Sequence, residues 1–154
     1  MIRLEAGQTA PNFELLDETG KAWSLRSLQG NKAIVFFYPA DDTPGCTIEA
    51  CDFRDNYDVF RTAGYEILGV SDQGAESHRS FKSKFGLSFP LLIDDSGEMA
   101  RAYGVWTNSG DHNGIPLHTA RATFVIDEQG KLVEARYGVR AKGHVEELVQ
   151  ALGL

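Results

Sequence analysis

The fold is decided by residues 33–51, which read AIVFFYPADDTPGCTIEAC. The stretch opens with a continuous apolar run at 33–38, rich in β-branched and aromatic side chains, which is typical of a central strand buried on both faces. Thr43 suits the N-cap of a helix, and Pro44 suits its first position, where the missing N–H needs no partner. The stretch therefore predicts a buried strand that passes through a short loop into a helix carrying both cysteines of the chain.

The rest of the chain alternates between strand and helix patterns. Further strands are predicted at 66–71, 91–93, 123–126 and 131–137, the last two joined into a hairpin by a turn at 128–130. Helices are predicted at 47–61, 75–85, 98–103 and 144–152. This alternation indicates an α/β fold with a mixed central sheet flanked by helices, parallel in its middle and antiparallel at one side. Residues 12–24 are predicted to form a separate N-terminal β-hairpin with a turn at 18–20.

Length and composition fit a single globular domain over residues 1–154, with 42% hydrophobic and 24% charged residues. The formal charge of −7 argues against nucleic acid or an anionic membrane as a partner. The first residues lack an apolar stretch of signal-peptide length, and no segment is apolar enough to span a bilayer, so we expect a cytoplasmic protein. In that reducing compartment, two cysteines are more often redox-active or metal-binding than structural.

Cys46 falls in the first turn of the predicted helix, where unpaired backbone N–H groups and the helix dipole favour a thiolate. Its neighbours in the sequence are acidic and oppose this effect. They are Asp41, Asp42, Glu49, Asp52 and Asp55. Arg54 is eight positions away, about two helical turns along. A reactive Cys46 therefore needs a cation from elsewhere in the chain.

Cys51 is the second cysteine, and it is rotated about 140° from Cys46 around the helix axis. Sulfur atoms on such different faces of an intact helix point apart, beyond what disulfide geometry accepts. If the two cysteines form a disulfide, the first helical turn must unwind. The spacing thus predicts a local unfolding step in any chemistry that joins them.

The two cysteines allow two other interpretations. Cys46 lies on the same side as an apolar helical stripe formed by Ala50, Phe53, Tyr57 and Phe60, and a cysteine there is often only a small core residue. A metal site would need two more ligands, for which His112 and His118 are available. However, Cys-x4-Cys is not a usual zinc spacing, so no metal is expected.

Other polar residues carry weaker signals. His78 and His144 are predicted to lie on solvated helix faces, and the adjacent acids Asp41-Asp42 and Asp94-Asp95 are predicted to be solvated in turns. Residues 106–119 are rich in Gly, Asn and Asp and predict a long surface loop. None of these features indicates a second site.

Several motifs together resemble the peroxiredoxin family. Pro39-x-x-x-Thr43-x-x-Cys46 resembles the active-site motif of these thiol peroxidases, and residues 43–51 resemble their bacterioferritin-comigratory (PrxQ-type) branch. The other matching stretches are Gly7-x-x-Ala10-Pro11-x-Phe13, Gly104-Val105-Trp106 and the segment 121–127, RATFVID. The likeness thus spans nearly the whole chain, and it implies a thioredoxin-like fold.

The resemblance also implies roles for single residues. Cys46 corresponds to the peroxidatic cysteine and Cys51 to the resolving one. Arg121 corresponds to the active-site arginine and would supply the missing cation, on a strand where it shares a face with Thr123 and Val125. Thr43, Gly45 and Arg121 would bind the peroxide, and Pro39 would shape and shield the pocket.

The implied function is reduction of hydrogen peroxide and organic hydroperoxides. The resulting intramolecular disulfide would be reduced by thioredoxin or a glutaredoxin, without a cofactor, in a monomeric cytoplasmic enzyme. Residues 107–114 depart from the Lys- and Tyr-containing segment of many relatives, so the preferred peroxide is not inherited from them.

Two alternatives stay open at this point. One is a thiol–disulfide oxidoreductase or methionine-sulfoxide-type reductase, against which the missing Cys-x-x-Cys motif counts. The other is a redox sensor or chaperone-like binding module, in which oxidation of the cysteines exposes apolar helix surface. Repeated turnover of peroxide separates an enzyme from such a switch.

Overall fold

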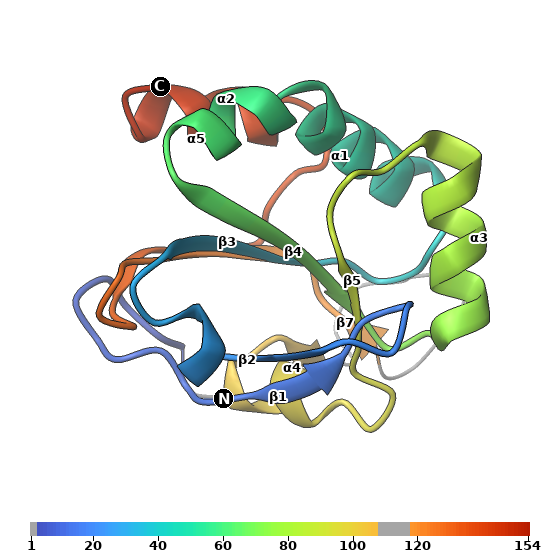
Figure 1. Ribbon diagram of the computed structural model, residues 1–154, viewed down its shortest axis with the longest axis horizontal. Helices are drawn as coiled ribbons and strands as arrows, with labels where there is room; N and C mark the ends of the chain where they lie inside the picture. The colour runs from blue at the N-terminus through green and yellow to red at the C-terminus, as the bar shows by residue number, and fades with distance from the viewer. Residues whose placement is uncertain (1–2, 108–117) are drawn as a thin grey trace.

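The computed structural model describes residues 3–107 and 118–154 and is built on a five-stranded mixed sheet (Figure 1). The strands lie in the order β5-β4-β3-β8-β9. Their bounds are β3 (Lys32–Phe37), β4 (Tyr65–Ser71), β5 (Leu91–Ile93), β8 (Ala122–Ile126) and β9 (Leu132–Tyr137). β3, β4 and β5 are parallel, whereas β8 pairs antiparallel with β3 and β9 pairs antiparallel with β8. The predicted mixed sheet, parallel in its middle, is confirmed.

Helices cover both faces of this sheet (Figure 1). The helices α1 (Pro44–Asp55), α2 (Tyr57–Thr62) and α5 (His144–Ala151) lie along one face, and α3 (Ala75–Phe85) lies beside β5. The opposite face carries α4 (Glu98–Ala102) and the predicted hairpin, β1 (Glu14–Leu16) with β2 (Ala22–Ser24), which the short 3-10 helix η1 (Arg26–Leu28) follows. Among the described residues, no helix has the length and apolarity to cross a membrane.

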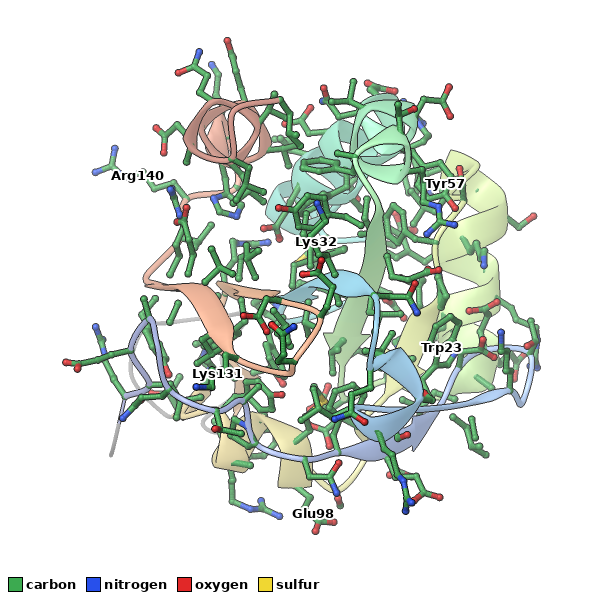
Figure 2. All side chains as sticks on the ribbon, turned by 60° about the vertical axis from the view of Figure 1, so that its left-hand side comes forward. Trp23, Lys32, Tyr57, Glu98, Lys131 and Arg140 are labelled. Atoms are coloured by element: carbon green, nitrogen blue, oxygen red, sulfur yellow. The ribbon has the colours of Figure 1, made fainter. Side chains whose placement is uncertain are left out.

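The central strand β3 has a buried side chain on each face. Ala33, Val35 and Phe37 belong to the apolar cluster beneath α4 and the hairpin. Ile34 and Phe36 belong to the other cluster, beneath the helices of the opposite face. This double burial explains the uninterrupted apolar run in the sequence, and Figure 2 shows side chains filling both layers.

The prediction of one helix over 47–61 was wrong. The chain forms two helices, separated at Asn56, whose φ of −104° and ψ of 10° leave the helical region. The Asn56 side-chain amide donates to the Asp52 carbonyl at 2.9 Å. Asparagine side chains compete in this way for backbone groups, which favours an interruption at this position.

The prediction of a surface loop over 106–119 was wrong at its two ends. β6 (Trp106–Thr107) pairs with β7 (His118–Thr119) in an antiparallel ladder. His118 is 6% exposed and Thr119 is fully buried. Residues 108–117, including the candidate ligand His112, lie outside the described residues.

Four polar residues that the sequence placed in solvent are buried instead. His78 and Asp94 are fully buried, His144 is 4% exposed, and the Asp41 side chain is 3% exposed. Each has partners inside the fold, as buried polar groups require. Asp94 accepts hydrogen bonds from the backbone N–H groups at positions 99 and 100 in α4, and His144 bonds the Thr123 hydroxyl at 2.8 Å.

Candidate active site

The candidate site lies where β3 ends and α1 begins. Residues 38–43 connect the two elements, and Thr43 is the N-cap, with an extended backbone (φ −101°, ψ 156°). Pro44 opens the helix, and Cys46 follows in its first turn. Cys46 is 1% exposed and belongs to the apolar cluster between α1 and the sheet. Its sulfur is therefore held in a dry environment next to the N-terminus of a helix, where the helix dipole favours an anion.

The cation that the sequence around Cys46 lacks comes from Arg121. Its Nη2 donates to the Cys46 Sγ at 3.4 Å, and its Nη1 donates to the Glu49 Oε1 at 2.8 Å. The Arg121 side chain is 15% exposed. Burial acts to lower the pKa of Arg121, but the nearby Glu49 and Cys46 outweigh it and raise that pKa above its usual value. Arg121 is therefore a permanent cation in contact with the sulfur.

Glu49 also belongs to the site. From the sequence it was expected only to oppose a thiolate at Cys46. Its side chain is fully buried, and its Oε2 has no hydrogen-bond partner among the described residues. Burial raises the pKa of Glu49 to about 7, against the lowering effect of Arg121. The sequence holds one indication that Glu49 belongs to the site, because a residue three positions after Cys46 lies on the same helix face.

Gly45 permits the approach of the guanidinium to the helix. A Cβ at this position would lie 3.0 Å from the Arg121 Nη2 and 3.7 Å from the Ala141 Cβ. The first contact is closer than side chains tolerate without moving. The glycine therefore leaves room for Arg121 on one side and for the loop that precedes α5 on the other.

Thr43 and Pro39 shape the entry to the helix. The Thr43 hydroxyl donates to the Ala40 carbonyl at 2.9 Å, so it makes no side-chain cap of α1, and Thr43 is the N-cap through its backbone alone. Its oxygen keeps lone pairs that can accept a hydrogen bond. Pro39 is buried, and its carbonyl accepts from the Gln73 Nε2 at 3.3 Å.

Cys51 lies two turns into α1 and is partly buried. Both thiols are free in this structure. Burial raises the pKa of Cys51, and Asp55 and Asp52 add to this while Arg54 opposes it. Cys51 is thus a protonated thiol at rest, five positions along an intact helix from Cys46.

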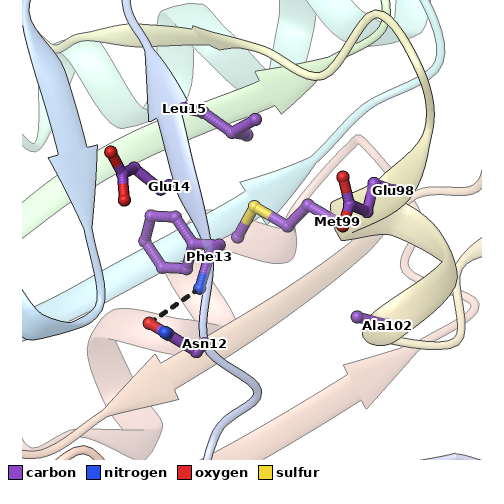
Figure 3. A pocket seen from close by; sticks show the side chains of 7 residues that line it. All are labelled: Asn12, Phe13, Glu14, Leu15, Glu98, Met99 and Ala102. Atoms are coloured by element: carbon purple, nitrogen blue, oxygen red, sulfur yellow. Dashed lines mark hydrogen bonds between the residues drawn. The ribbon is translucent and has the colours of Figure 1, made fainter.

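A pocket lies on the opposite face of the sheet from Cys46 (Figure 3). It is lined by Asn12, Phe13, Glu14, Leu15, Glu98, Met99 and Ala102, between the hairpin and α4. The lining holds no cysteine or histidine, so it offers no thiol chemistry. Over residues 3–107 and 118–154, no group of three or more His, Cys, Asp or Glu side chains is arranged to hold a metal ion.

Comparison with known proteins identifies the family. The sequence profile described as the AhpC/TSA family matches residues 6–135. Peroxiredoxin Bcp of Bacillus subtilis is 40% identical to the chain, covering 98% of it and 96% of the relative. The chain is a peroxiredoxin of the AhpC/TSA family. This peroxiredoxin is also 38% identical to the chloroplastic peroxiredoxin Q of Sedum lineare, over 97% of the chain and 78% of that protein.

Solved structures agree with this assignment. The bacterioferritin comigratory protein of Xanthomonas campestris superposes with a TM-score of 0.86 at 33% identity, covering 96% of this peroxiredoxin and 97% of that chain. A PrxQ mutant of Xylella fastidiosa superposes with a TM-score of 0.90 at 27% identity, covering 99% and 96% of the two chains. The expected thioredoxin-like fold is confirmed, and the protein is a peroxidase of the oxidoreductase class.

Proposed function

We propose that this peroxiredoxin reduces hydrogen peroxide and organic hydroperoxides with Cys46 as the peroxidatic cysteine and Cys51 as the resolving cysteine. The observation that carries the proposal is the hydrogen bond from the Arg121 Nη2 to the Cys46 Sγ. It pairs the sulfur with a fixed cation inside a nearly dry site, where such a contact is worth more than in water. A merely structural cysteine has no need of that partner.

In the first step, the Cys46 thiolate attacks the terminal oxygen of the peroxide and the O–O bond breaks. The sulfur is oxidised to sulfenic acid, and the departing oxygen takes a proton and leaves as water or an alcohol. Arg121 and the unpaired N–H groups of the first turn of α1 lie where negative charge develops, and they stabilise it. The Thr43 oxygen can accept a hydrogen bond from the peroxide O–H.

In the second step, the Cys51 sulfur attacks the Cys46 sulfenic acid, an S–S bond forms, and water leaves. The first turn of α1 must unwind for the two sulfurs to meet, which breaks the 2.8 Å hydrogen bond from the Thr47 N–H to the Thr43 carbonyl. An external dithiol, thioredoxin or a glutaredoxin, then reduces the disulfide and becomes oxidised itself.

The second cysteine in the same helix supports action as a monomer, since no other subunit has to supply the resolving thiol. The bacterioferritin comigratory protein of Xanthomonas campestris has alkyl peroxide reduction activity, which supports organic hydroperoxides among the substrates here. A dithiol protein of the cytoplasm is proposed as the reductant, because an intramolecular disulfide is reduced by exchange with an external dithiol.

The test is NADPH consumption in the presence of thioredoxin, thioredoxin reductase and either hydrogen peroxide or cumene hydroperoxide. Wild-type protein is compared with Cys46→Ser and Cys51→Ser. We expect sustained turnover by the wild type, none by Cys46→Ser, and a single oxidation without recycling by Cys51→Ser. A wild-type protein that forms one disulfide and then stops would replace the peroxidase with a redox switch, and full recycling by Cys51→Ser would remove Cys51 from the cycle.

A further inference from the structure

A buried histidine–aspartate pair involves the loop that precedes α1. The His78 Nδ1 is 2.6 Å from the Asp41 Oδ2, and the two side chains are 0% and 3% exposed. His78 belongs to α3, whereas Asp41 belongs to the loop between β3 and α1. The pair therefore ties a loop of the candidate active site to a helix that carries none of its proposed reactive groups.

The pair has further hydrogen-bond partners on both sides. The Leu92 carbonyl, which only accepts, lies 2.8 Å from the His78 Nε2. Both carboxylate oxygens of Asp41 accept as well, Oδ1 from the Tyr38 hydroxyl at 2.6 Å and Oδ2 from the Ser77 hydroxyl at 2.8 Å. The Leu92 carbonyl requires a hydrogen on the His78 Nε2, and a second hydrogen lies between Nδ1 and the Asp41 Oδ2, so the ring joins both partners at once.

Tyr38 is a permanent donor in this network. It is 1% exposed, and burial together with Asp41 raises the pKa of its hydroxyl well above the usual value. The Asp41 carboxylate is thus held by three donors, from Tyr38, Ser77 and His78. Removing one of these partners leaves the buried Asp41 carboxyl group short of a hydrogen bond, which is far more disruptive than losing a hydrogen bond at the surface.

Backbone contacts carry this anchoring toward Cys46. The Asp41 N–H donates to the Gln73 Oε1 at 2.8 Å, and the Gln73 Nε2 donates to the Pro39 carbonyl. Between these two fixed points lies Ala40, whose carbonyl accepts the Thr43 hydroxyl. The position of Thr43, and with it the start of α1, therefore depends on where Asp41 is held.

Asp42 follows directly and has a φ of 56°, the one positive value at a non-glycine position in the described chain. Non-glycine residues adopt this left-handed conformation at a cost in free energy, and it persists where neighbouring contacts hold it. The strained residue sits between the anchored Asp41 and the N-cap Thr43. The chain thus changes direction sharply at the boundary between the fixed loop and the helix that must unwind.

We propose that Asp41 and His78 are positioning residues for the peroxide reaction, holding residues 39–43 in the geometry that peroxide binding at Cys46 requires. The inference rests on the proposed function of Cys46. The pair touches neither the sulfur nor the peroxide and acts through the loop. Its expected signature is a selective loss of the reaction with peroxide, in which the Thr43 oxygen takes part, while the intrinsic reactivity of the sulfur is retained.

Two substitutions at one position separate this role from simple packing of α3. His78→Asn keeps a donor near the place of Nδ1, facing Asp41, and gives up the bond to Leu92. His78→Gln keeps a donor near the place of Nε2, facing Leu92, and leaves Asp41 with one donor fewer. If His78 only packs α3 against β5, the Asn variant is affected at least as strongly as the Gln variant.

The experiment measures second-order rate constants of reduced Cys46 with hydrogen peroxide and with iodoacetamide, on the full-length protein in a Cys51→Ser background. We expect His78→Gln to slow the peroxide reaction about tenfold or more, since small displacements of reacting groups cost this much. His78→Asn should lie within about threefold of the parent, because it keeps the hydrogen bond to Asp41. The iodoacetamide rate, which needs no peroxide geometry, should stay within about twofold in both.

Tyr38→Phe removes one donor to Asp41 without changing the shape of the ring, and it serves if His78→Gln does not fold. It should show the same selective loss. Equal peroxide rates in the parent, His78→Gln and Tyr38→Phe would overturn the inference, as would an equal loss in His78→Asn and His78→Gln. Failure of the proposed function looks different, because the parent protein itself would then consume no peroxide through Cys46.

Discussion

Arg121 and Cys46 are 75 positions apart in the chain, yet the guanidinium of one donates to the sulfur of the other at 3.4 Å. The register of the sheet explains this contact. Ala122, the first residue of β8, pairs with Phe37, the last residue of β3. Arg121 directly precedes β8 and therefore lies at the end of the sheet where the chain leaves β3 toward α1. The antiparallel pairing of β8 with β3 therefore brings the cation to the cysteine, and no local sequence feature does.

Replacing Arg121 by Lys should slow the reaction of Cys46 with hydrogen peroxide by roughly 100-fold, because a single ammonium cannot donate to both Cys46 and Glu49 in the fork geometry of arginine. Stopped-flow measurement of the second-order rate constant checks this. Lys82→Arg, a change of cation on α3 at a distance from the sulfur, is the control. An unaltered rate in Arg121→Lys would reduce Arg121 to a charge that merely balances Glu49.

Gly45→Ala should slow the same reaction, because the new Cβ would lie 3.0 Å from the Arg121 Nη2 and displace the guanidinium. We expect a loss of about tenfold or more, as for other small displacements of catalytic groups. The matched control is Gly74→Ala, since a Cβ at position 74 meets nothing within 4 Å. Equal rates in both variants would show that Arg121 reaches the sulfur by another route.

Glu49→Gln should change the dependence of stability on pH. The pKa of Glu49 is about 7 in the folded protein, above the 4.5 that is usual for the group. The stability that follows from this raised pKa is fully present below about pH 4.5 and is lost as the pH rises to about 7. The free energy of unfolding of the wild type, relative to Glu49→Gln, should therefore fall across this interval.

Urea unfolding of the reduced proteins at a series of pH values measures that difference. The Asp58→Asn variant changes an exposed acid of α2 and serves as the control, with no comparable trend expected. A wild-type stability that rises relative to Glu49→Gln between pH 4.5 and 7 would mean that the ion pair with Arg121 outweighs burial.

His144→Gln should show the opposite trend. Burial, followed by Arg136 and Arg121, lowers the pKa of His144 to about 4 from 6.5. The stability contributed by the neutral imidazole is present above about pH 6.5 and is lost as the pH falls toward 4. Gln keeps a polar group near the Thr123 hydroxyl but does not titrate. The stability of the wild type relative to this variant should increase from pH 4 to 6.5, and a flat difference would contradict the burial of a neutral His144.

The apolar periodicity of the chain was enough to predict the sheet, most helices and the N-terminal hairpin, because burial on one or two faces leaves a direct mark on the sequence. The helix break at Asn56 was missed, since a single residue within a helical pattern decides it. The burial of Asp41, His78 and Asp94 was also missed. Polar residues are buried only when distant partners meet them, and the sequence does not show which segments will meet.

The candidate site shows the same division. The placement of Thr43 and Cys46 at the start of the helix follows from the local strand–loop–helix pattern, whereas Pro39 and Arg121 were identified through the family resemblance alone. The role of Glu49 could not be predicted from the sequence, because it depends on a contact with Arg121. The two residues are 72 positions apart in the chain, but their side chains are 2.8 Å apart in the fold. The peroxiredoxin assignment favours a peroxidase over the two alternatives that the sequence left open, a thiol–disulfide or methionine-sulfoxide-type reductase and a redox sensor.

The separation of α1 from α2 at Asn56 makes the cysteine-bearing helix a unit with defined ends. Phe60 in α2 is fully buried, and its ring centroid lies 5.9 Å from that of Phe53 in α1. Changes at the inward-facing positions of α1 therefore disturb the packing of α2, because Ala50 and Phe53 are buried in the same cluster as Phe60. A resolving cysteine can therefore be gained, lost or relocated during evolution only at positions of α1 that the core does not use, and the partly buried position 51 is one of them.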